Sequence, residues 1–514
     1  MAQATAIPLT GDDVRLEDVW AVAHGHAGAV LSDEARRKMR AARELVERAA
    51  HGTREHTYGI NTGFGRFVSQ SIPEEQTEEL QLRLLRSHAC GVGDPYPDEI
   101  VRAAMLLRAN ALAKGNSGAR IETVELLLEC LGRGVLPLVP SRGSVGASGD
   151  LAPLAHLALP LVGEGLAWFD GELLSGAEAL AGSGLEPTRL AAKEGLSLIN
   201  GTQFMAAYGA LGLIRARRLA LTADLACALS LEALQGSRTS FLPQIHRLRP
   251  LKGQADSAAN VLLLLEGSAI IEAHKWCDKV QDAYSLRCAP QVQGAARDLL
   301  DYVEGTVAIE LNAATDNPLV LVDDELLVSN GNFHGQPLAF ALDALAMACS
   351  ELANISERRV ERLVNPNLSD GLPAFLTEEG GLNSGFMIPQ YVAASLVSEN
   401  KALCHPASVD SIPTSAGQED HVSMGNAAGL KAWQVIENVE SALAIELLAG
   451  AQAVEFLAPL EPGAGVRATH DFVRSLSPRL GDDRPLAPDI AAVAAAIRDG
   501  SLVAAAEAAV GELA

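Results

Sequence analysis

Three consecutive small residues could together do chemistry that no single side chain can: Ala147, Ser148 and Gly149. Gly149 offers an unhindered backbone nitrogen, and only a methyl group shields the carbonyl carbon of Ala147. Because glycine adopts backbone angles closed to other residues, a compressed loop here would let that nitrogen attack that carbonyl. Loss of water, and then of the Ser148 hydroxyl, would leave a five-membered ring with an exocyclic methylene. The tripeptide therefore predicts a strong electrophile, with Asp150 as the base or hydrogen-bond acceptor that assists its formation.

Two simpler interpretations of this tripeptide stay open. One is a turn of small residues before a helix, because Ala-Ser-Gly is a common sequence. The other is a serine nucleophile, although the order here is G-A-S-G-D and not the G-x-S-x-G of a nucleophile elbow. The surrounding fourteen residues, GSVGASGDLAPLAH (143–156), favour the electrophile. Metal catalysis is disfavoured because the chain has neither H-E-x-x-H nor C-x-x-C.

The composition predicts a mainly helical protein with a large core. Of the 514 residues, 48% are hydrophobic and only 4% are aromatic, a balance that favours helices over β-sandwiches. The length suits two to four domains or one large helical body. The formal net charge of −24 disfavours binding to a nucleic acid, whose phosphates it would repel.

The cysteines and the start of the chain predict a cytoplasmic protein. The seven widely spaced cysteines are typical of reduced thiols: Cys90, Cys130, Cys227, Cys277, Cys288, Cys349 and Cys404. The N-terminal residues lack the basic and apolar regions of a secretory signal. Two uncharged windows, 195–214 and 380–398, contain polar residues that a lipid-facing helix would avoid. We expect both windows to be buried or to line a site, with no contact to a membrane.

Hydrophobic spacing and turn residues predict the elements that position these groups. Helices are expected over 32–51, with Ser32 as N-cap, and over 73–89, 98–114, 342–355 and 429–457. Hairpins are expected at 167–174, turning at Asp170-Gly171, and at 318–328, turning near Asp323-Asp324. The helix expected over 429–457 is apolar on more than one side, as in a bundle core or an oligomer interface. A Pro/Gly-rich stretch, 459–488, is expected to end the bundle before a short Ala-rich helix.

Eight stretches of the chain resemble the aromatic amino acid lyase family, whose members carry a methylidene-imidazolone ring formed from Ala-Ser-Gly. They occur in family order, and the resemblance extends from about residue 17 to residue 502. The stretches are YGINTGFG (58–65), RSHACG (86–91), GSVGASGDLAPLAH (143–156), EGLSLINGTQ (194–203), VQDAYSLRCAPQ (280–291), DNPLV (316–320), SNGNFHG (329–335) and QEDHVSMG (418–425).

The resemblance implies a fold and an assembly. The expected fold is mainly α, with a long central helical bundle of the fumarase/aspartase-like type, a smaller N-terminal α-rich domain and minor hairpins. Residues 1–205 would carry the catalytic loop and the electrophile, and residues 206–514 the bundle and C-terminal helices. The family assembles as a homotetramer in which residues of more than one subunit line each site.

The resemblance also implies the reaction. The cofactor would be 4-methylidene-imidazol-5-one formed from residues 147–149, with no external cofactor and no metal. Its Ser148-derived methylene would capture the substrate, most simply at its amine, and a base would then remove the β-proton. Tyr58 is implied as that base; because a free phenol has a pKa of about 10, its site must depress the pKa or remove the proton through a neighbour. Tyr284 matches a second family tyrosine near the ring, and which of the two carries the proton stays open.

Further residues are expected to hold the substrate and the ring. Arg287 suits the substrate carboxylate, because a planar guanidinium donates two parallel hydrogen bonds. If its segment is helical, Gln281 and Tyr284 fall near the same face. Asn200 either caps a helix or, by resemblance, holds the ring oxygen or the carboxylate. Phe333 is expected to line the site near the ring, with core packing as the alternative.

The substrate implied is L-histidine, converted to trans-urocanate in the first step of histidine degradation. His88 and Glu419 match positions where histidine-specific members hydrogen-bond an imidazole. Tyrosine-specific members also carry the histidine but usually follow it with leucine, where this chain has Ala89. Relatives often carry asparagine or a larger residue in place of Gly417, which leaves fine selectivity open.

Other interpretations stay open. A tyrosine or phenylalanine ammonia-lyase or aminomutase of the same family is the first alternative, and a catalytically silent scaffold of the same fold is the second. Asp420, His421 and His156 are interpreted as structural residues around the site.

Overall fold

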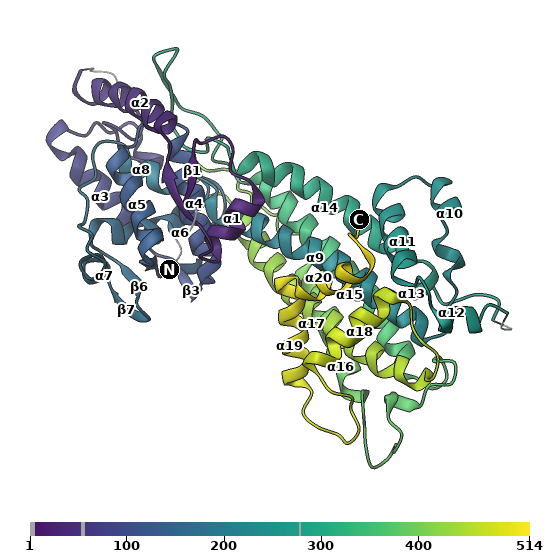
Figure 1. Cartoon of the computed structure of the whole chain (residues 1–514). Helices are drawn as coiled ribbons and strands as arrows, with labels where there is room; N and C mark the ends of the chain where they lie inside the picture. Colours follow the sequence, from purple (N-terminus) through teal and green to yellow (C-terminus); the bar gives the residue numbers. More distant parts are fainter. Residues whose placement is uncertain (1–5, 53–56, 277–278) are drawn as a thin grey trace. The chain divides into compact units, whose positions relative to one another are not determined.

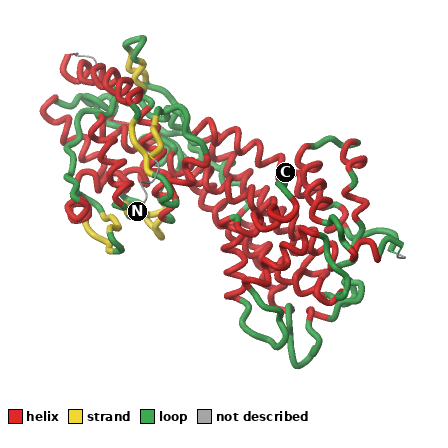
Figure 2. Tube along the Cα trace, viewed as in Figure 1, coloured by secondary structure: helices red, strands yellow, loops and turns green. Residues whose placement is uncertain are grey.

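The computed structural model describes residues 6–52, 57–276 and 279–514. In these ranges the chain is mainly helical with a few short strands, which confirms the expected fold class (Figure 2). The chain divides into two compact units. Unit 1 contains residues 1–212, 304–343 and 406–430, and unit 2 contains residues 213–303, 344–405 and 431–514. Residues 1–205, the expected first domain, thus all belong to unit 1, but two later segments join them.

Unit 1 combines short helices with four small sheets (Figure 1). Its helices are α1 (Leu16–Ala23), α2 (Asp33–Gly52), α3 (Thr77–His88), α4 (Asp98–Ala113), α5 (Ile121–Arg133), α6 (Leu151–Ala158), α7 (Gly176–Ser183) and α8 (Glu194–Ile199). Its sheets are the parallel pair β1 (Ala6–Leu9) and β2 (Gly28–Leu31), and the antiparallel groups β3 (Val92–Pro95) with β5 (Pro140–Arg142), β4 (Leu136–Pro137) with β6 (Leu166–Phe169) and β7 (Glu172–Ser175), and β8 (Leu319–Leu321) with β9 (Leu326–Val328).

Long helices dominate the rest of the chain. Four of them have residues in both units: α9 (Gln203–Ala233), α14 (Ala289–Glu310), α15 (Gln336–Val364) and α17 (Gly425–Val454). The others belong to unit 2: α10 (Pro243–Arg247), α11 (Lys252–Leu264), α12 (Ala269–Ala273), α13 (Tyr284–Arg287), α16 (Met387–Leu403), α18 (Ala464–Leu476), α19 (Ala487–Asp499) and α20 (Ser501–Val510).

The local sequence signals that we singled out are confirmed in unit 1. The helices expected at 32–51, 73–89 and 98–114 are α2, α3 and α4. Ser32 caps α2, because its hydroxyl accepts a hydrogen bond of 3.1 Å from the backbone of Ala35. Both hairpins form, and the β6–β7 turn has positive φ at Asp170 and Gly171, as a tight hairpin turn requires.

The apolar stripe of α15 is buried, which confirms its expected role in the core; its members are Leu342, Leu345, Cys349, Leu352 and Ile355. Within the described ranges, α15 is also the one helix long and apolar enough to cross a membrane, and 78% of its apolar window is buried inside the protein. The expected core helix at 429–457 is α17, in which residues 442–454 are buried on all sides.

One expectation was wrong, and another is met only in part. The Pro/Gly-rich stretch 459–488 contains α18, and two helices follow it rather than one. The window 380–398, expected to be buried or to line a site, is only partly buried: α16 buries Pro389 and Ala393 and exposes Tyr391, and its Ile388 and Val392 line a pocket. A segment without charged residues can be buried at little cost, but whether it is buried depends on what packs against it in the fold.

Candidate active site

The Ala-Ser-Gly tripeptide lies in the loop between β5 and α6, where segments far apart in sequence hold it. Gly149 has a φ of +74°, and a Cβ at this position would lie 2.0 Å from the carbonyl oxygen of Gly201. No larger residue fits there. The carbonyl oxygen of Gly146 accepts hydrogen bonds from the backbone of Gly335 (3.1 Å) and from the hydroxyl of Ser423 (3.0 Å). The loop is therefore fixed on both sides of Ser148.

Ser148 contacts two of the predicted site residues. Its hydroxyl donates a hydrogen bond of 2.8 Å to Oε1 of Glu419, whose Oε2 accepts one of 2.6 Å from the hydroxyl of Thr414. The amide nitrogen of Asn200 donates to the backbone oxygen of Ser148 at 3.1 Å. Oδ1 of Asn200 is buried and has no hydrogen-bond donor within the described part of the chain. That arrangement leaves an acceptor available beside the tripeptide.

Asp150 is fully buried directly after the tripeptide. Burial raises the pKa of its carboxyl to about 7, although hydrogen bonds from the backbones of Met205 and Phe204 and from the Ser144 hydroxyl lower it. The two backbone bonds, of 3.0 and 2.9 Å, attach Asp150 to the start of α9. A carboxyl with this pKa exchanges protons readily near neutral pH.

Tyr58 is mostly buried, and its environment does not depress its pKa. Burial raises the pKa of the phenol; a backbone hydrogen bond with Gly65 lowers it, and the nearby carboxylates of Glu419 and Asp316 raise it further. Its ring meets that of Phe64 edge-on, with the centroids 6.0 Å apart. Of the two routes open to a tyrosine base, the structure thus favours proton loss to a neighbour over a low pKa.

His88 ends α3 and lies close enough to Glu419 to be influenced by its charge. Burial lowers the pKa of its imidazole and outweighs a hydrogen bond with the Leu84 backbone and the Glu419 charge, which raise it, so the environment favours the neutral ring. Nδ1 lies 2.9 Å from the Leu84 oxygen, which leaves Nε2 as the nitrogen that can meet a ligand. His156 has a structural contact instead: its Nε2 accepts a hydrogen bond of 3.0 Å from the backbone of Gly91.

Three predicted site residues belong to unit 2. Tyr284 is 71% exposed, and the Arg287 guanidinium stacks over its ring at 4.4 Å from the centroid. Only Tyr284–Arg287 is helical and Gln281 precedes the helix, so the condition under which all three would share a helical face is not met. Gln281 and Arg287 instead line one cleft of about 710 Å³. Nε of Arg287 donates to the backbone oxygen of Asp282 at 3.0 Å, which holds the side chain in place.

The remaining predicted residues lie in unit 1. Phe333 is half-buried, whereas Asp420 and His421 are exposed. The His421 ring stacks against that of His334, with the centroids 5.7 Å apart. This contact joins the segment of Phe333 to that of Glu419, in keeping with a structural role for His421.

Comparison with known proteins assigns the family. The sequence pattern of the family described as aromatic amino acid lyase matches residues 14–475. The chain belongs to the aromatic amino acid lyase family. It is 57% identical to the histidine ammonia-lyase of Gloeobacter violaceus over 505 residues, which cover 98% of each chain.

Two solved structures share the fold of this family member. The histidine ammonia-lyase of Trypanosoma cruzi is 46% identical, with a TM-score of 0.92 and 99% and 96% of the two chains covered. The tyrosine aminomutase of Streptomyces globisporus is 38% identical, with a TM-score of 0.94 and 99% and 100% covered. Fold alone therefore does not separate histidine from tyrosine chemistry within the family.

Sequence reasoning missed several residues around this lyase site. Thr414 holds the second oxygen of Glu419, and Arg108 is a fully buried guanidinium that donates to the backbone oxygen of Asn200 at 2.7 Å. Both stand outside the stretches that resemble the family, so no local signal marked them. Lys193 and Asp316 form a buried ion pair nearby. Asp316 opens the stretch DNPLV, but its partner was not evident from the sequence.

The cysteines do not add a metal site to the part of this lyase that the structure describes. In that part, no group of three or more His, Cys, Asp or Glu side chains is placed to hold a metal ion. The six described cysteines are free thiols, and Cys277 lies outside the described residues.

Proposed function

We propose that this protein is a histidine ammonia-lyase, which eliminates ammonia from L-histidine to give trans-urocanate as the first step of histidine degradation. The observation that carries the proposal is the carboxylate of Glu419, placed 2.8 Å from the hydroxyl of Ser148 and within electrostatic reach of His88. A relative that is 57% identical over 98% of both chains carries this activity in its name, which supports the proposal.

The residues around the tripeptide fit a methylidene-imidazolone. Gly149 is in a conformation and a space that only glycine accepts, and its neighbour Asp150 is a buried carboxyl able to take or give a proton. Asn200 donates to the backbone oxygen of Ser148, the atom that becomes the ring oxygen. When formed from residues 147–149, this group supplies an electrophile that turns the substrate nitrogen into a better leaving group. Asn200 and Asp150 would hold it.

The side chains of unit 1 then act on the substrate. His88 and Glu419 bind the imidazole: a neutral histidine ring and a carboxylate offer the hydrogen bonds that an imidazole can make. Tyr58 removes the β-proton. Because burial and the Glu419 charge raise the pKa of this phenol, Tyr58 must lose its own proton before it can take one from the substrate. Phe333 closes the apolar side of the site.

The carboxylate of the substrate is bound by Arg287, with Tyr284 and Gln281 beside it. These residues belong to unit 2, and we propose that they reach the site of unit 1 from a second copy of the chain in a homotetramer. In support, Tyr284 is 71% exposed, and the neighbouring Val280 is 93% exposed. Large hydrophobic side chains that are exposed to solvent in a functional segment indicate a surface that a partner covers.

Tyrosine or phenylalanine lyase or aminomutase chemistry is the second candidate, favoured by the fold shared with the tyrosine aminomutase. Ala89 after His88, together with Glu419 beside Ser148, makes histidine the better substrate. Cytoplasmic localisation and the absence of nucleic-acid and membrane partners remain part of the proposal, supported by the net charge of −24 and the free thiols.

One experiment tests the activity and the electrophile together. Purified protein is mixed separately with L-histidine, L-tyrosine and L-phenylalanine, and the near-ultraviolet absorbance of each unsaturated product is followed. A rise with L-histidine alone, abolished in Ser148→Ala, is the expected result. A rise only with tyrosine or phenylalanine would overturn the assignment of His88 and Glu419. An intact mass without the loss of two waters would overturn the ring.

A further inference from the structure

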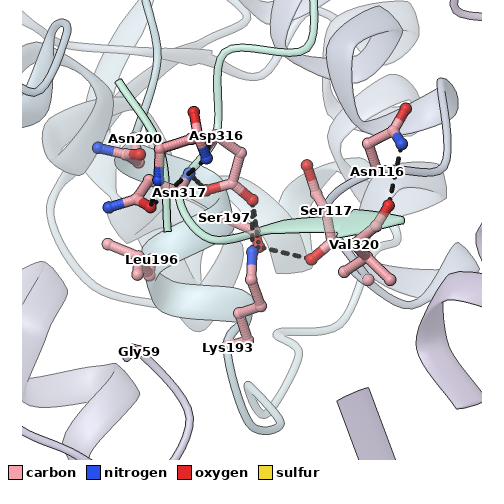
Figure 3. Close-up of polar contacts among 12 residues, drawn as sticks. Gly59, Asn116, Ser117, Lys193, Leu196, Ser197, Asn200, Asp316, Asn317 and Val320 are labelled. Carbon is pink, nitrogen blue, oxygen red and sulfur yellow. Dashed lines mark hydrogen bonds and ion pairs between the residues drawn. The ribbon is translucent and has the colours of Figure 1, made fainter. Parts of the chain in front are cut away.

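Two fully buried charges face each other in unit 1 (Figure 3). Nζ of Lys193 lies 2.6 Å from Oδ2 of Asp316, and both side chains are completely buried. Nζ also lies 3.1 Å from the hydroxyl of Ser197. Withdrawing two charges from water costs about as much free energy as their attraction returns, so such a pair is weak support for stability. The role of this ion pair is therefore sought in the segments of the chain that it holds in place.

Lys193 has a strained backbone at the start of α8. Its φ is +69°, a left-handed conformation that is unfavourable for a non-glycine residue. The strain occurs at the residue whose side chain reaches Asp316, directly before the first turn of the helix. The contact and the beginning of α8 are therefore set by the same residue.

Helix α8 touches both halves of the proposed catalytic machinery. Asn200 caps its C-terminal end and donates to the backbone oxygen of Ser148 at 3.1 Å. Leu196, in its middle, packs against Gly59: a Cβ on that glycine would lie 2.4 Å from the leucine side chain. Gly59 directly follows Tyr58, so a shift of α8 displaces the tripeptide contact and the proposed base together.

Asp316 connects the same helix to the segment of Phe333. Its Oδ1 accepts a hydrogen bond of 2.7 Å from the backbone of Asn317, and its backbone oxygen accepts one of 3.1 Å from the side chain of Asn330. Further along this segment, the backbone of Gly335 donates to the tripeptide loop. The ion pair, together with the hydrogen bond of 3.1 Å that the Ser197 hydroxyl donates to Oδ2 of Asp316, thus links α8 to the other segment that holds this loop.

We propose that Lys193 and Asp316 are positioning residues for the elimination reaction: their ion pair fixes α8, and α8 sets the places of Asn200 and Tyr58. The inference rests on the proposed function for its kinetic consequence. Its structural consequence, a fixed α8, does not depend on the substrate.

The test is the double variant Lys193→Met/Asp316→Asn, which removes both charges and leaves none buried alone. If the pair served stability only, this variant would keep its activity, because neutral replacement of a buried pair is often harmless. We expect instead a folded protein with kcat for L-histidine at least about tenfold lower, since small misplacements of catalytic groups are costly. We also expect faster amide hydrogen exchange in residues 57–64 and 194–203.

A matched control is Arg215→Met/Glu440→Gln, which neutralises another buried ion pair, in unit 2, with a separation of 2.8 Å. It should leave exchange in 57–64 and 194–203 at the wild-type rate. If the double variant fails to fold, Ser197→Ala is the milder variant to use. It should lower kcat and speed up amide exchange as the double variant does, but to a smaller extent. If Lys193→Met/Asp316→Asn, or Ser197→Ala in its place, folds and shows the wild-type rate of amide exchange in 57–64 and 194–203, the proposal is overturned. Inactivity of the wild-type protein on L-histidine would instead overturn the proposed function, and the exchange rates would still decide the role of the pair.

Discussion

The Ser148 hydroxyl donates a hydrogen bond of 2.8 Å to Oε1 of Glu419, across 271 residues of sequence. The same carboxylate accepts a hydrogen bond from Thr414 and raises the pKa values of Tyr58 and His88. One side chain therefore acts on the electrophile-forming serine, on the proposed base and on the proposed imidazole ligand. Its charge is the feature of the site most open to experiment.

Removing the charge of Glu419 should weaken histidine binding and lower the pKa of Tyr58, the proposed base. In Glu419→Gln the shape is kept, and kcat/KM for L-histidine should fall about 10–100-fold, the usual cost of losing a charged hydrogen-bond partner. The acidic limb of the pH–rate profile should move to lower pH, because a carboxylate that raises the pKa of Tyr58 has gone. Steady-state kinetics across pH measure both. Asp420→Asn, at the exposed neighbour, is the control that should change neither.

The reaction should speed up as the pH rises above neutrality. Tyr58 must lose its proton to act as a base, and its raised pKa keeps most of it protonated at pH 7. Tyr58→Phe should lower kcat about 10²–10⁴-fold, as expected for loss of a general base. A kcat/KM value that does not change between about pH 7 and about pH 10 would argue against a tyrosine base. Tyr284→Phe, compared in the same assay, decides which tyrosine carries the proton.

Asp150 should make the protein less stable as the pH rises. Its pKa is raised from 3.8 to about 7 in the folded chain, so the folded state holds the proton more tightly than the unfolded state. The stabilisation is complete below pH 3.8 and is lost as the pH rises through about 7. Asp150→Asn should remove this loss, which is roughly 4 kcal/mol in the free energy of unfolding over the whole range, with roughly 3 kcal/mol of it between about pH 5 and about pH 8.

Urea unfolding of Asp150→Asn at about pH 5 and about pH 8 measures that difference. Asp170→Asn, at an exposed carboxyl in the β6–β7 turn, is the matched control and should follow the wild-type curve. A wild-type midpoint that does not fall between the two pH values would contradict the raised pKa of Asp150.

Shared active sites should show complementation between two inactive variants. Ser148→Ala lacks the electrophile, and Arg287→Ala lacks the carboxylate ligand, which belongs to unit 2. If each site takes these residues from different subunits, mixed tetramers should recover about a quarter of the wild-type activity by random assembly. The measurement is the lyase rate of co-expressed, co-purified variants. Ser148→Ala mixed with Asn200→Ala should recover nothing, because those residues touch within one unit.

Local features were predictable from sequence because their causes are local. Ser32 before α2, the Asp170-Gly171 turn and the apolar stripe of α15 each depend on a few neighbouring residues, and each is confirmed. The proposed electrophile has an equally local origin, because its atoms would come from three consecutive residues and would need a glycine where the structure has a φ of +74° at Gly149.

Tertiary structure decided what depends on distant neighbours. It placed Glu419 beside Ser148 and paired Lys193 with Asp316, and neither spacing is encoded in any local pattern. It also set the pKa of Tyr58, for which the chemistry left two routes open and which burial raises. Composition and periodicity predicted the helices, and three consecutive residue types predicted the tripeptide. Burial and charge, which exist only once the chain has folded, determined how the tripeptide is surrounded.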